Sequence, residues 1–359
     1  VGFKPATDVD PCLFISDKVI CIAYVDDCIM FAKDQKDIDN VTQALRERKM
    51  TLEKEADVAG FLGVHIERKQ DRVKLTQVGL TKRIIEAVGA NDLPPVCTPA
   101  TEVLGKDPDG DPPNGTFNYA SVIGMLWYLY GHSRPDLGFA VSQAARFAFA
   151  PKRSHELALI RIGQYLKATL NEGLELKPDD WSSFKMDVYV DSDFLGIHGK
   201  ELRTDPDNVK SRAGFVIILN GCPIIWTSKL MDAVCVSTMM AEHYALSLAM
   251  REVLPLRDLV RTVANGCGIK TECQTTFRVN VWEDNMGALT LANLDPGQTT
   301  SRSRFYDSKV HWFRSHLTDD PHNAIEVKKV DSKFQLADIF TKPLVRETFT
   351  FIRNLLMGW

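Results

Sequence analysis

Two adjacent carboxylates, Asp26 and Asp27, stand between two short apolar runs of the chain. The runs at residues 20–23 and 28–31 are typical of β-strands, so the pair is expected at the tip of a hairpin. Two like charges beside apolar neighbours repel each other, and a divalent cation bound by both would neutralise them. The pattern favours a metal site, although residues 24–27 alone are also typical of an ordinary acidic turn.

Acidic residues also mark the ends of two expected strands in the second half of the chain. Asp191 ends the strand at residues 188–190, and Asp193 follows two residues later on the same side of an extended chain. Asp284 comes directly after the strand at residues 279–282. A carboxylate at such a position is also an ordinary cap or surface residue, so neither strand defines a site by itself.

Two more carboxylates lie on or near expected helices. Glu242 follows Ser237 and Thr238, either of which can cap a helix with an apolar face rich in alanine and leucine. Glu242 lies beside that apolar face, so its side chain is expected at the edge of the face, near the sheet on which the helix packs. Asp338 lies in the expected helix near residues 334–340, within the sequence Leu-Ala-Asp-Ile-Phe-Thr-Lys-Pro-Leu at residues 336–344. Each of these two acids, considered alone, is also typical of a cap or surface position.

The apolar periodicity predicts the elements that must position these acids. After the hairpin, a helix is expected at residues 38–54, short strands at 62–66 and 73–75, and a helix at 81–88. A linker rich in Pro, Gly and Asp spans residues 91–118, and three helices follow at 119–129, 136–149 and 155–170.

From residue 186 onward the pattern changes to strands. Three consecutive strands are followed by alternating helices and strands, which predicts a mixed sheet with helices packed on it. The expected strands lie at 186–190, 213–219, 223–226, 277–282 and 324–330, and the expected helices lie at 238–251, from 285, and near 334–340.

The bulk composition predicts a soluble protein with two or three domains in its 359 residues. Hydrophobic residues make up 45% and charged residues 25%, and no run approaches the ~20 apolar residues needed to cross a bilayer. The first residues do not resemble a signal peptide. The eight cysteines form no CxxC pair, so free buried thiols in a reducing compartment are expected rather than zinc sites or disulfides.

The net charge of −4 does not indicate a nucleic-acid binder, which would more often be basic. Cations are nevertheless concentrated at residues 66–86 and again at residues 302–314. Such clusters are either solvated faces or phosphate contacts that are independent of sequence and sensitive to salt.

The motif at residues 24–27, set between its apolar strands, resembles the palm hairpin of reverse transcriptases. The similarity extends along nearly the whole chain to copia-type LTR retrotransposon polyproteins, through residues 2–14, 61–66, 119–129 and 133–137. It implies a multidomain protein of α/β and α+β class. The implied parts are the end of a reverse-transcriptase palm with a thumb-like region at 1–100, a linker and helical connection at 101–180, a ribonuclease H-like domain at 181–345, and a C-terminal tail at 346–359.

The resemblance also implies the site residues. The order of Asp191, Glu242, Asp284 and Asp338 matches the Asp, Glu, Asp, Asp arrangement of ribonuclease H, and Asp26 and Asp27 match polymerase ligands. Two Mg²⁺ ions ~4 Å apart need several shared oxygen ligands, one ion activating water and the other stabilising the leaving 3′ oxygen. Mn²⁺ is an alternative cofactor.

The implied partners are an RNA/DNA hybrid, a template–primer nucleic acid and upstream segments of the polyprotein, without a membrane. The family's fingers and first palm aspartate lie upstream of the matched motifs, so polymerisation is expected only with those parts. Localisation is expected in the cytoplasm, with a virus-like particle or the nucleus as alternatives. Asp193 and Glu283 are interpreted as cap or supporting residues. Residues 303–311 are interpreted either as substrate-facing surface or as the core face of a helix.

The resemblance implies an enzyme that hydrolyses the RNA strand of RNA/DNA hybrids with two metal ions, and two rival functions remain open. Met240 and His243 stand where the family often has an acid and a tyrosine, so an inert nucleic-acid-binding remnant of a degenerate element is one alternative. A transposase or integrase is the other, but those enzymes usually use three acids and lack the neighbouring palm hairpin.

Overall fold

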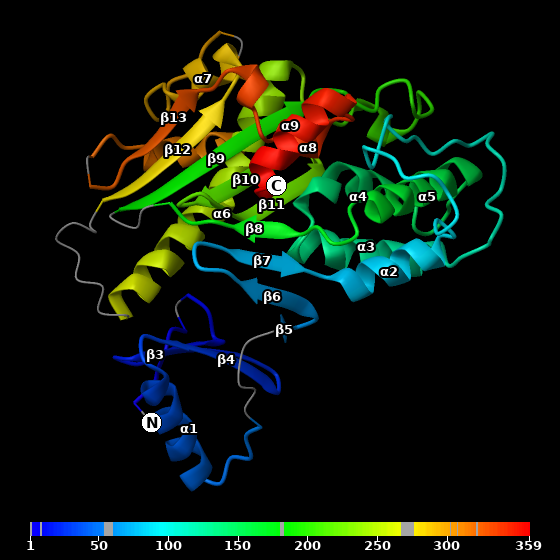
Figure 1. The fold of residues 1–359 in the computed structure, drawn as a ribbon. Helices are drawn as coiled ribbons and strands as arrows, with labels where there is room; N and C mark the ends of the chain where they lie inside the picture. The colour runs from blue at the N-terminus through cyan, green and yellow to red at the C-terminus, as the bar shows by residue number, and fades with distance from the viewer. Residues whose placement is uncertain are drawn as a thin grey trace. The chain divides into compact units, whose positions relative to one another are not determined.

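The computed structural model describes residues 2–7, 9–53, 60–179, 183–266, 276–301, 303–306, 308–320 and 322–359. The chain forms two compact units (Figure 1). Unit 1 comprises Val1–Gly63 and Met250–Thr275, and unit 2 comprises Val64–Ala249 and Thr276–Trp359.

Unit 1 contains an antiparallel sheet whose strands are neighbours in chain order. The sheet consists of β1 (Lys4–Pro5), β2 (Leu13–Ile15), β3 (Val19–Tyr24) and β4 (Asp27–Ala32). Unit 1 also contains α1 (Gln35–Glu47) and β5 (Gly60–Phe61). The expected hairpin is present, but Tyr24 pairs with Asp27, so the turn consists of Val25 and Asp26. Helix α1 ends earlier than expected because the chain leaves helical geometry at Lys49, which has a φ of 69°.

Unit 2 begins with a helical layer beside a small sheet. The antiparallel strands are β6 (Val64–Arg68), β7 (Val73–Thr76) and β8 (Leu174–Leu176), and the helices are α2 (Val78–Ala87), α3 (Tyr119–His132), α4 (Gly138–Ala145) and α5 (Arg153–Ala168). Asn118 caps α3 by accepting a hydrogen bond from the amide of Ser121 at 2.9 Å. Pro135 opens a 3-10 turn before α4, the first-turn position that proline favours.

A second sheet in unit 2 has the strand order β11-β10-β9-β12-β13. In chain order the sheet begins with three antiparallel strands, β9 (Phe184–Asp193), β10 (Arg212–Leu219) and β11 (Cys222–Leu230). The two later strands run parallel to β9; they are β12 (Phe277–Glu283) and β13 (Ile325–Lys329). It is accompanied by α7 (Met286–Ala292), α8 (Asp338–Thr341) and the first part of α6 (Thr238–Gly266), up to Ala249. The rest of α6 belongs to unit 1. The prediction of a mixed sheet with flanking helices is confirmed.

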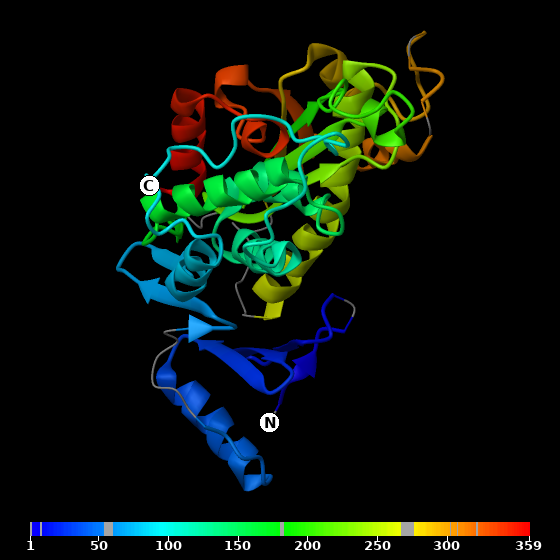
Figure 2. The same ribbon diagram turned by 90° about the vertical axis from the view of Figure 1, so that its right-hand side faces the viewer.

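The helical layer and this second sheet share one hydrophobic core. Buried side chains of α2–α5 pack together with Val216 of β10 and Phe340 of α8. Helix α9 (Arg346–Met357) joins the same core through Phe349, Ile352 and Leu356, and Figure 2 shows this red C-terminal helix beside the green helices. The sequence analysis assigned no helix to these last residues.

Helix α6 is 29 residues long and continues beyond the expected end at residue 251, with Pro255 inside it. Proline lacks an N–H donor and usually ends a helix, which is why the extension was not expected. Even α6 is not apolar enough to cross a membrane, and the same holds for every other helix in the described ranges. The six cysteines in those ranges are free thiols as expected, but only Cys21, Cys222 and Cys235 are buried.

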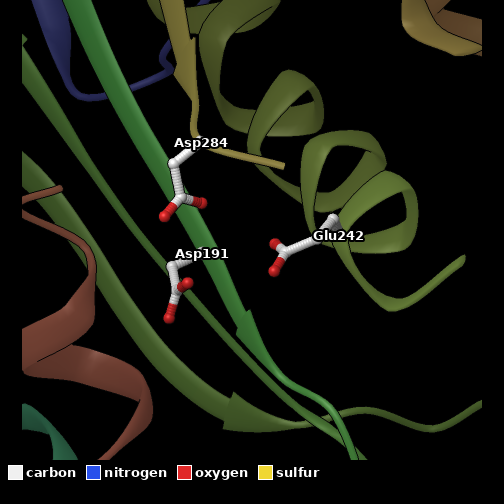
Figure 3. Close-up of side chains that lie close together, drawn as sticks. All are labelled: Asp191, Glu242 and Asp284. Atoms are coloured by element: carbon white, nitrogen blue, oxygen red, sulfur yellow. The ribbon is translucent and has the colours of Figure 1, made fainter. Parts of the chain in front are cut away.

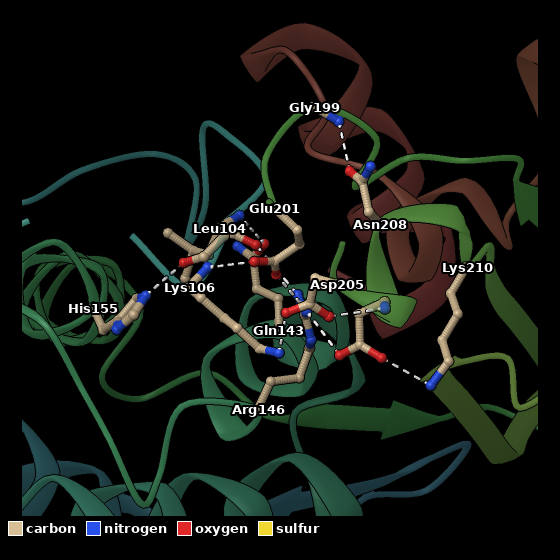
Figure 4. A network of polar contacts seen from close by, with 12 residues as sticks. Leu104, Lys106, Gln143, Arg146, His155, Gly199, Glu201, Asp205, Asn208 and Lys210 are labelled. Carbon is tan, nitrogen blue, oxygen red and sulfur yellow. Dashed lines mark hydrogen bonds and ion pairs between the residues drawn. The ribbon is translucent and has the colours of Figure 1, made fainter. Parts of the chain in front are cut away.

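The long segment between β9 and β10 is fastened to the linker and to α4 (Figure 4). The buried carboxylate of Glu201 accepts hydrogen bonds from Arg146 at 2.7 Å and from the Lys106 amide at 2.9 Å. Asp207 lies 3.4 Å from Arg146, and Asp205 pairs with the Lys106 ammonium. Residues far apart in the sequence therefore form one polar network.

Candidate metal centre

Asp191 lies near the end of β9, the central strand of the second sheet, opposite Gly214 of β10. A Cβ atom at Gly214 would lie 2.7 Å from side-chain carbons of both Phe340 and Thr341. Glycine at this position therefore lets α8 approach the sheet closely. As a result the Thr341 hydroxyl donates a hydrogen bond to Oδ2 of Asp191.

Three carboxylates from separate elements converge at this end of the sheet. Asp191, Glu242 and Asp284 each offer an oxygen within 4.8 Å of the others, and Figure 3 shows their carboxyl groups pointing toward a common space. Glu242 lies near the start of α6, where Ser237 accepts a hydrogen bond from the Met240 amide at 3.1 Å. This bond caps the helix as expected.

The third member of the group, Asp284, directly follows β12. Its Oδ2 accepts a hydrogen bond from the Ser332 hydroxyl at 2.7 Å, and its backbone carbonyl accepts one from Lys329. These contacts fix the carboxylate at the end of the strand.

Asp338, the fourth acid in the expected set, opens α8 beside this group. The ammonium of Lys342 lies 2.9 Å from Oδ1 of Asp338 and 3.4 Å from Oδ2 of Asp191, so the two acids share one cation. The structure thus brings together the four acids that were expected as nuclease ligands. Asp191, Glu242 and Asp284 lie together directly, and Asp338 joins them through its contact with Lys342.

Asp193 and Glu283, the two acids interpreted as cap or supporting residues, have different surroundings. Glu283 is fully buried, and its Oε1 accepts a hydrogen bond from the Asn285 amide at 2.9 Å, which supports the turn into α7. Asp193 lies at the end of β9, outside the group of three carboxylates. A supporting role fits Glu283, since its buried charge acts on Glu242.

Burial dominates the electrostatics of the centre. It raises the pKa of Asp191 to about 7, helped by the negative charges of Asp338 and Asp284 and opposed by Lys342. Burial also raises the pKa of Glu242 well above its usual value, and the charges of Asp191 and Glu283 add to this effect. The protein therefore holds several carboxyl groups where their ionised forms are poorly solvated.

A divalent metal ion fits this arrangement. Among the described residues, Oε2 of Glu242 and Oε2 of Glu283 are buried without a hydrogen-bond partner, and an ion bound by the cluster would compensate the Glu242 oxygen. The donor set consists only of carboxylate oxygens, which suit hard cations such as Mg²⁺ and Mn²⁺.

Lys342, Thr341 and Gly214 are the neighbours of the site that the sequence analysis did not identify. A signal for Lys342 was present, because it follows Asp338 by four residues, the spacing of an ion pair on a helix. No comparable signal marked Gly214, whose importance arises from the contact between α8 and β10.

The other two expected ligands, Asp26 and Asp27, lie in unit 1 at the exposed hairpin tip, whereas the four acids above belong to unit 2. Val25, in the same turn, has a φ of 53°, which is unusual for a β-branched residue. Within the described ranges, no third acid, histidine or cysteine joins this pair in a group that could hold a metal ion.

Residues 303–311, for which two interpretations were open, have both exposed and buried parts; Asp307 lies outside the described residues. Phe305 is 79% exposed, with the Arg304 guanidinium 4.7 Å from the centre of its ring. Tyr306 shares a hydrogen bond of 2.8 Å with Ser237, and His311 shares one of 2.9 Å with the buried His243. The segment is thus anchored to α6 near Glu242 and contains a short 3-10 helix at Ser308–Val310 instead of an α-helix.

The chain is similar to known reverse transcriptases and retrotransposon polyproteins. A family model described as reverse transcriptase (RNA-dependent DNA polymerase) matches residues 4–102. The retrovirus-related Pol polyprotein from transposon RE2 of Arabidopsis thaliana is 28% identical over 356 residues, which cover 97% of this chain and 22% of that protein. The corresponding polyprotein from transposon TNT 1-94 of Nicotiana tabacum is 26% identical over 360 residues, covering 96% of this chain and 25% of that protein.

The chain therefore spans about a quarter or less of the length of these relatives. Among solved structures, the N-terminal RNase H domain of rv2228c from Mycobacterium tuberculosis, solved as a fusion with maltose binding protein, matches 47% of this chain and 96% of that chain. The identity is 10% and the TM-score is 0.28.

Proposed function

Because the chain belongs to the family of copia-type retrotransposon Pol polyproteins, we propose that its second unit is a ribonuclease H that hydrolyses the RNA strand of RNA/DNA hybrids. The observation that carries this proposal is the convergence of Asp191, Glu242 and Asp284 within 4.8 Å, with Asp338 beside them. Four carboxylates at one sheet end are the ligand supply that a two-metal nuclease needs.

Some residues of the chain would bind the ions, and others would orient the residues that bind them. Two bound Mg²⁺ ions would activate a water molecule and stabilise the leaving 3′ oxygen. Asp191 would be the ligand common to both ions, because it belongs to the group with Glu242 and Asp284 and shares the Lys342 ammonium with Asp338. The Thr341 hydroxyl and the strand pairing of β9 fix the orientation of Asp191, while burial keeps bulk water away from its carboxylate.

Recognition of the RNA strand would come from contacts to its 2′-hydroxyl groups across the minor groove. Arg304 and the exposed Phe305 are candidates for such a surface, because their segment is anchored to α6 near Glu242. A guanidinium and an aromatic ring are suited to phosphate contact and stacking, respectively.

For unit 1 we propose a partial role in RNA-directed DNA polymerisation. Asp26 and Asp27 would supply two metal ligands, and a further palm carboxylate and the fingers would come from other segments of the polyprotein. Residues 4–102, which match the reverse-transcriptase family model, support this assignment.

The test of the nuclease uses the full chain, a hybrid with labelled RNA, and Mg²⁺. We expect cleavage that requires the ion and is lost in Asp191→Asn and in Glu242→Gln. Glu326→Gln is the matched control, since Glu326 lies at the opposite end of the parallel strands and should cleave normally. A folded protein that binds the hybrid and leaves its RNA intact would support the inert remnant instead.

A further inference from the structure

Lys342 reaches into the candidate metal centre from the end of α8. Its ammonium lies between two proposed ligands, 2.9 Å from Asp338 and 3.4 Å from Asp191. The side chain remains 37% exposed, so it has access to solvent. Lys342 itself has an extended backbone, with φ −143° and ψ 157°, as the residue that ends the helix.

The other half of the centre has no such cation. Within the described part of the chain, neither Glu242 nor Asp284 forms an ion pair through its carboxylate, whereas Asp191 and Asp338 both pair with Lys342. Oε2 of Glu242 and Oδ1 of Asp338 both lack a hydrogen-bond partner there, but the Asp338 oxygen lies 2.9 Å from the Lys342 ammonium. Lys329 contacts Asp284 only through the backbone carbonyl. The two halves therefore differ: Asp191 and Asp338 are already neutralised by an ammonium, whereas Glu242 and Asp284 are not.

An ion bound between Asp191 and Asp338 would compete with Lys342 for the same space. Mg²⁺ lies about 2.1 Å from its oxygen ligands, and the ammonium is already in contact with oxygens of both acids. A divalent ion and an ammonium a few ångströms apart also repel each other. The long, partly exposed lysine side chain can leave this position by rotating toward water.

We propose that Lys342 is an internal counter-ion that holds Asp191 and Asp338 in the metal-free protein and must leave before a second divalent ion binds. This inference rests on the proposed two-metal function. It makes binding ordered: the first ion occupies the Asp191, Glu242 and Asp284 group, and the second binds more weakly because it displaces the lysine. Lys342 is thus a positioning residue that sets the concentration of metal at which the centre fills.

The test measures metal binding without substrate, by calorimetry with Mg²⁺ and by counting bound Mn²⁺ with electron paramagnetic resonance. In Lys342→Met the second ion should bind about tenfold more tightly, because its cationic competitor is gone. Lys342→Arg keeps the charge and should keep the weak second site. Lys333→Met is the matched control, since it removes a cation of the same unit whose ammonium lies over the rings of Phe334 and Phe351 instead of between two carboxylates.

Several outcomes would overturn the proposal. An unchanged or weaker second site in Lys342→Met, with two ions still bound by the wild type, would refute the lysine's role and leave the nuclease proposal standing. Equal tightening in Lys333→Met would show a general charge effect and refute the specific role of Lys342. A wild type that binds no ion at all would remove both proposals. Lys342→Gln, checked by circular dichroism, replaces Lys342→Met if the latter does not fold.

Discussion

Gly214 lies opposite Asp191 in the ladder between β10 and β9, and its missing side chain makes room for α8. The surroundings of the Asp191 carboxylate on β9 therefore depend on the absence of a side chain at Gly214 on β10. Without the glycine, Thr341 could not reach Asp191, and Asp338 and Lys342 would be held further from it.

Gly214→Ala should therefore weaken both folding and metal binding. Because the added methyl group would lie 2.7 Å from side-chain carbons of Phe340 and Thr341, we expect the free energy of unfolding to fall by about 1–3 kcal/mol. Urea denaturation measures the first effect and calorimetry with Mg²⁺ the second. Gly124→Ala in α3 is the control: a Cβ there meets nothing within 4 Å, so its stability should be unchanged or slightly higher.

Glu242→Gln should stabilise the protein when metal is removed. The substitution replaces a buried carboxylate, one oxygen of which has no partner among the described residues, by a neutral amide. We expect a gain of about 1–3 kcal/mol in EDTA. Mg²⁺ should raise the melting temperature of the wild type and have much less effect on the variant. A variant that melts below the wild type in EDTA would contradict this account of the centre.

The stability of the metal-free protein should depend on pH through Asp191. Its pKa is about 7 in the folded state and 3.8 in the unfolded chain, so the folded state binds the extra proton between these values. The contribution of Asp191 to stability is therefore present below pH 4 and is lost as the pH rises toward 7. Asp191→Asn lacks this loss, so its stability relative to the wild type should increase over the same range and then level off. Urea denaturation in EDTA at several pH values measures the difference, and a constant difference would contradict the prediction.

Arg314→Lys should loosen the segment that carries Arg304 and Phe305. The buried guanidinium donates to the backbone carbonyls of Leu294 at 3.2 Å and Gln298 at 2.9 Å, and also to that of Asp295. A lysine cannot reproduce this fork of donors. We expect faster trypsin cleavage near Arg304 and a loss of about 1–3 kcal/mol in stability. Arg346→Lys, at the exposed start of α9, should change neither.

Part of this structure could be predicted from the sequence because local patterns determine it. The hairpin of β3 and β4, the mixed sheet and the capped start of α6 all follow from apolar alternation and capping residues. The expectation that Asp191, Glu242, Asp284 and Asp338 lie in one place came instead from the resemblance to ribonuclease H.

The remaining features depend on contacts that no local pattern describes. Pro255 is accommodated inside α6 although proline normally ends a helix. The value of Gly214 comes from the approach of α8, and the hairpin turn is shifted by one residue because Tyr24 pairs with Asp27. The placement of Lys342 between two acids likewise required the three-dimensional arrangement.

The network around Glu201 determines how this protein can be divided. A fragment starting at residue 181 would leave the buried Glu201 carboxylate without its partners, Arg146 and the Lys106 amide. It would also lack helices α2–α5, against which Val216 and Phe340 pack. Losing the partner of a buried charge and a hydrophobic layer together is a severe destabilisation. The second sheet and the helical layer must therefore be expressed as one piece.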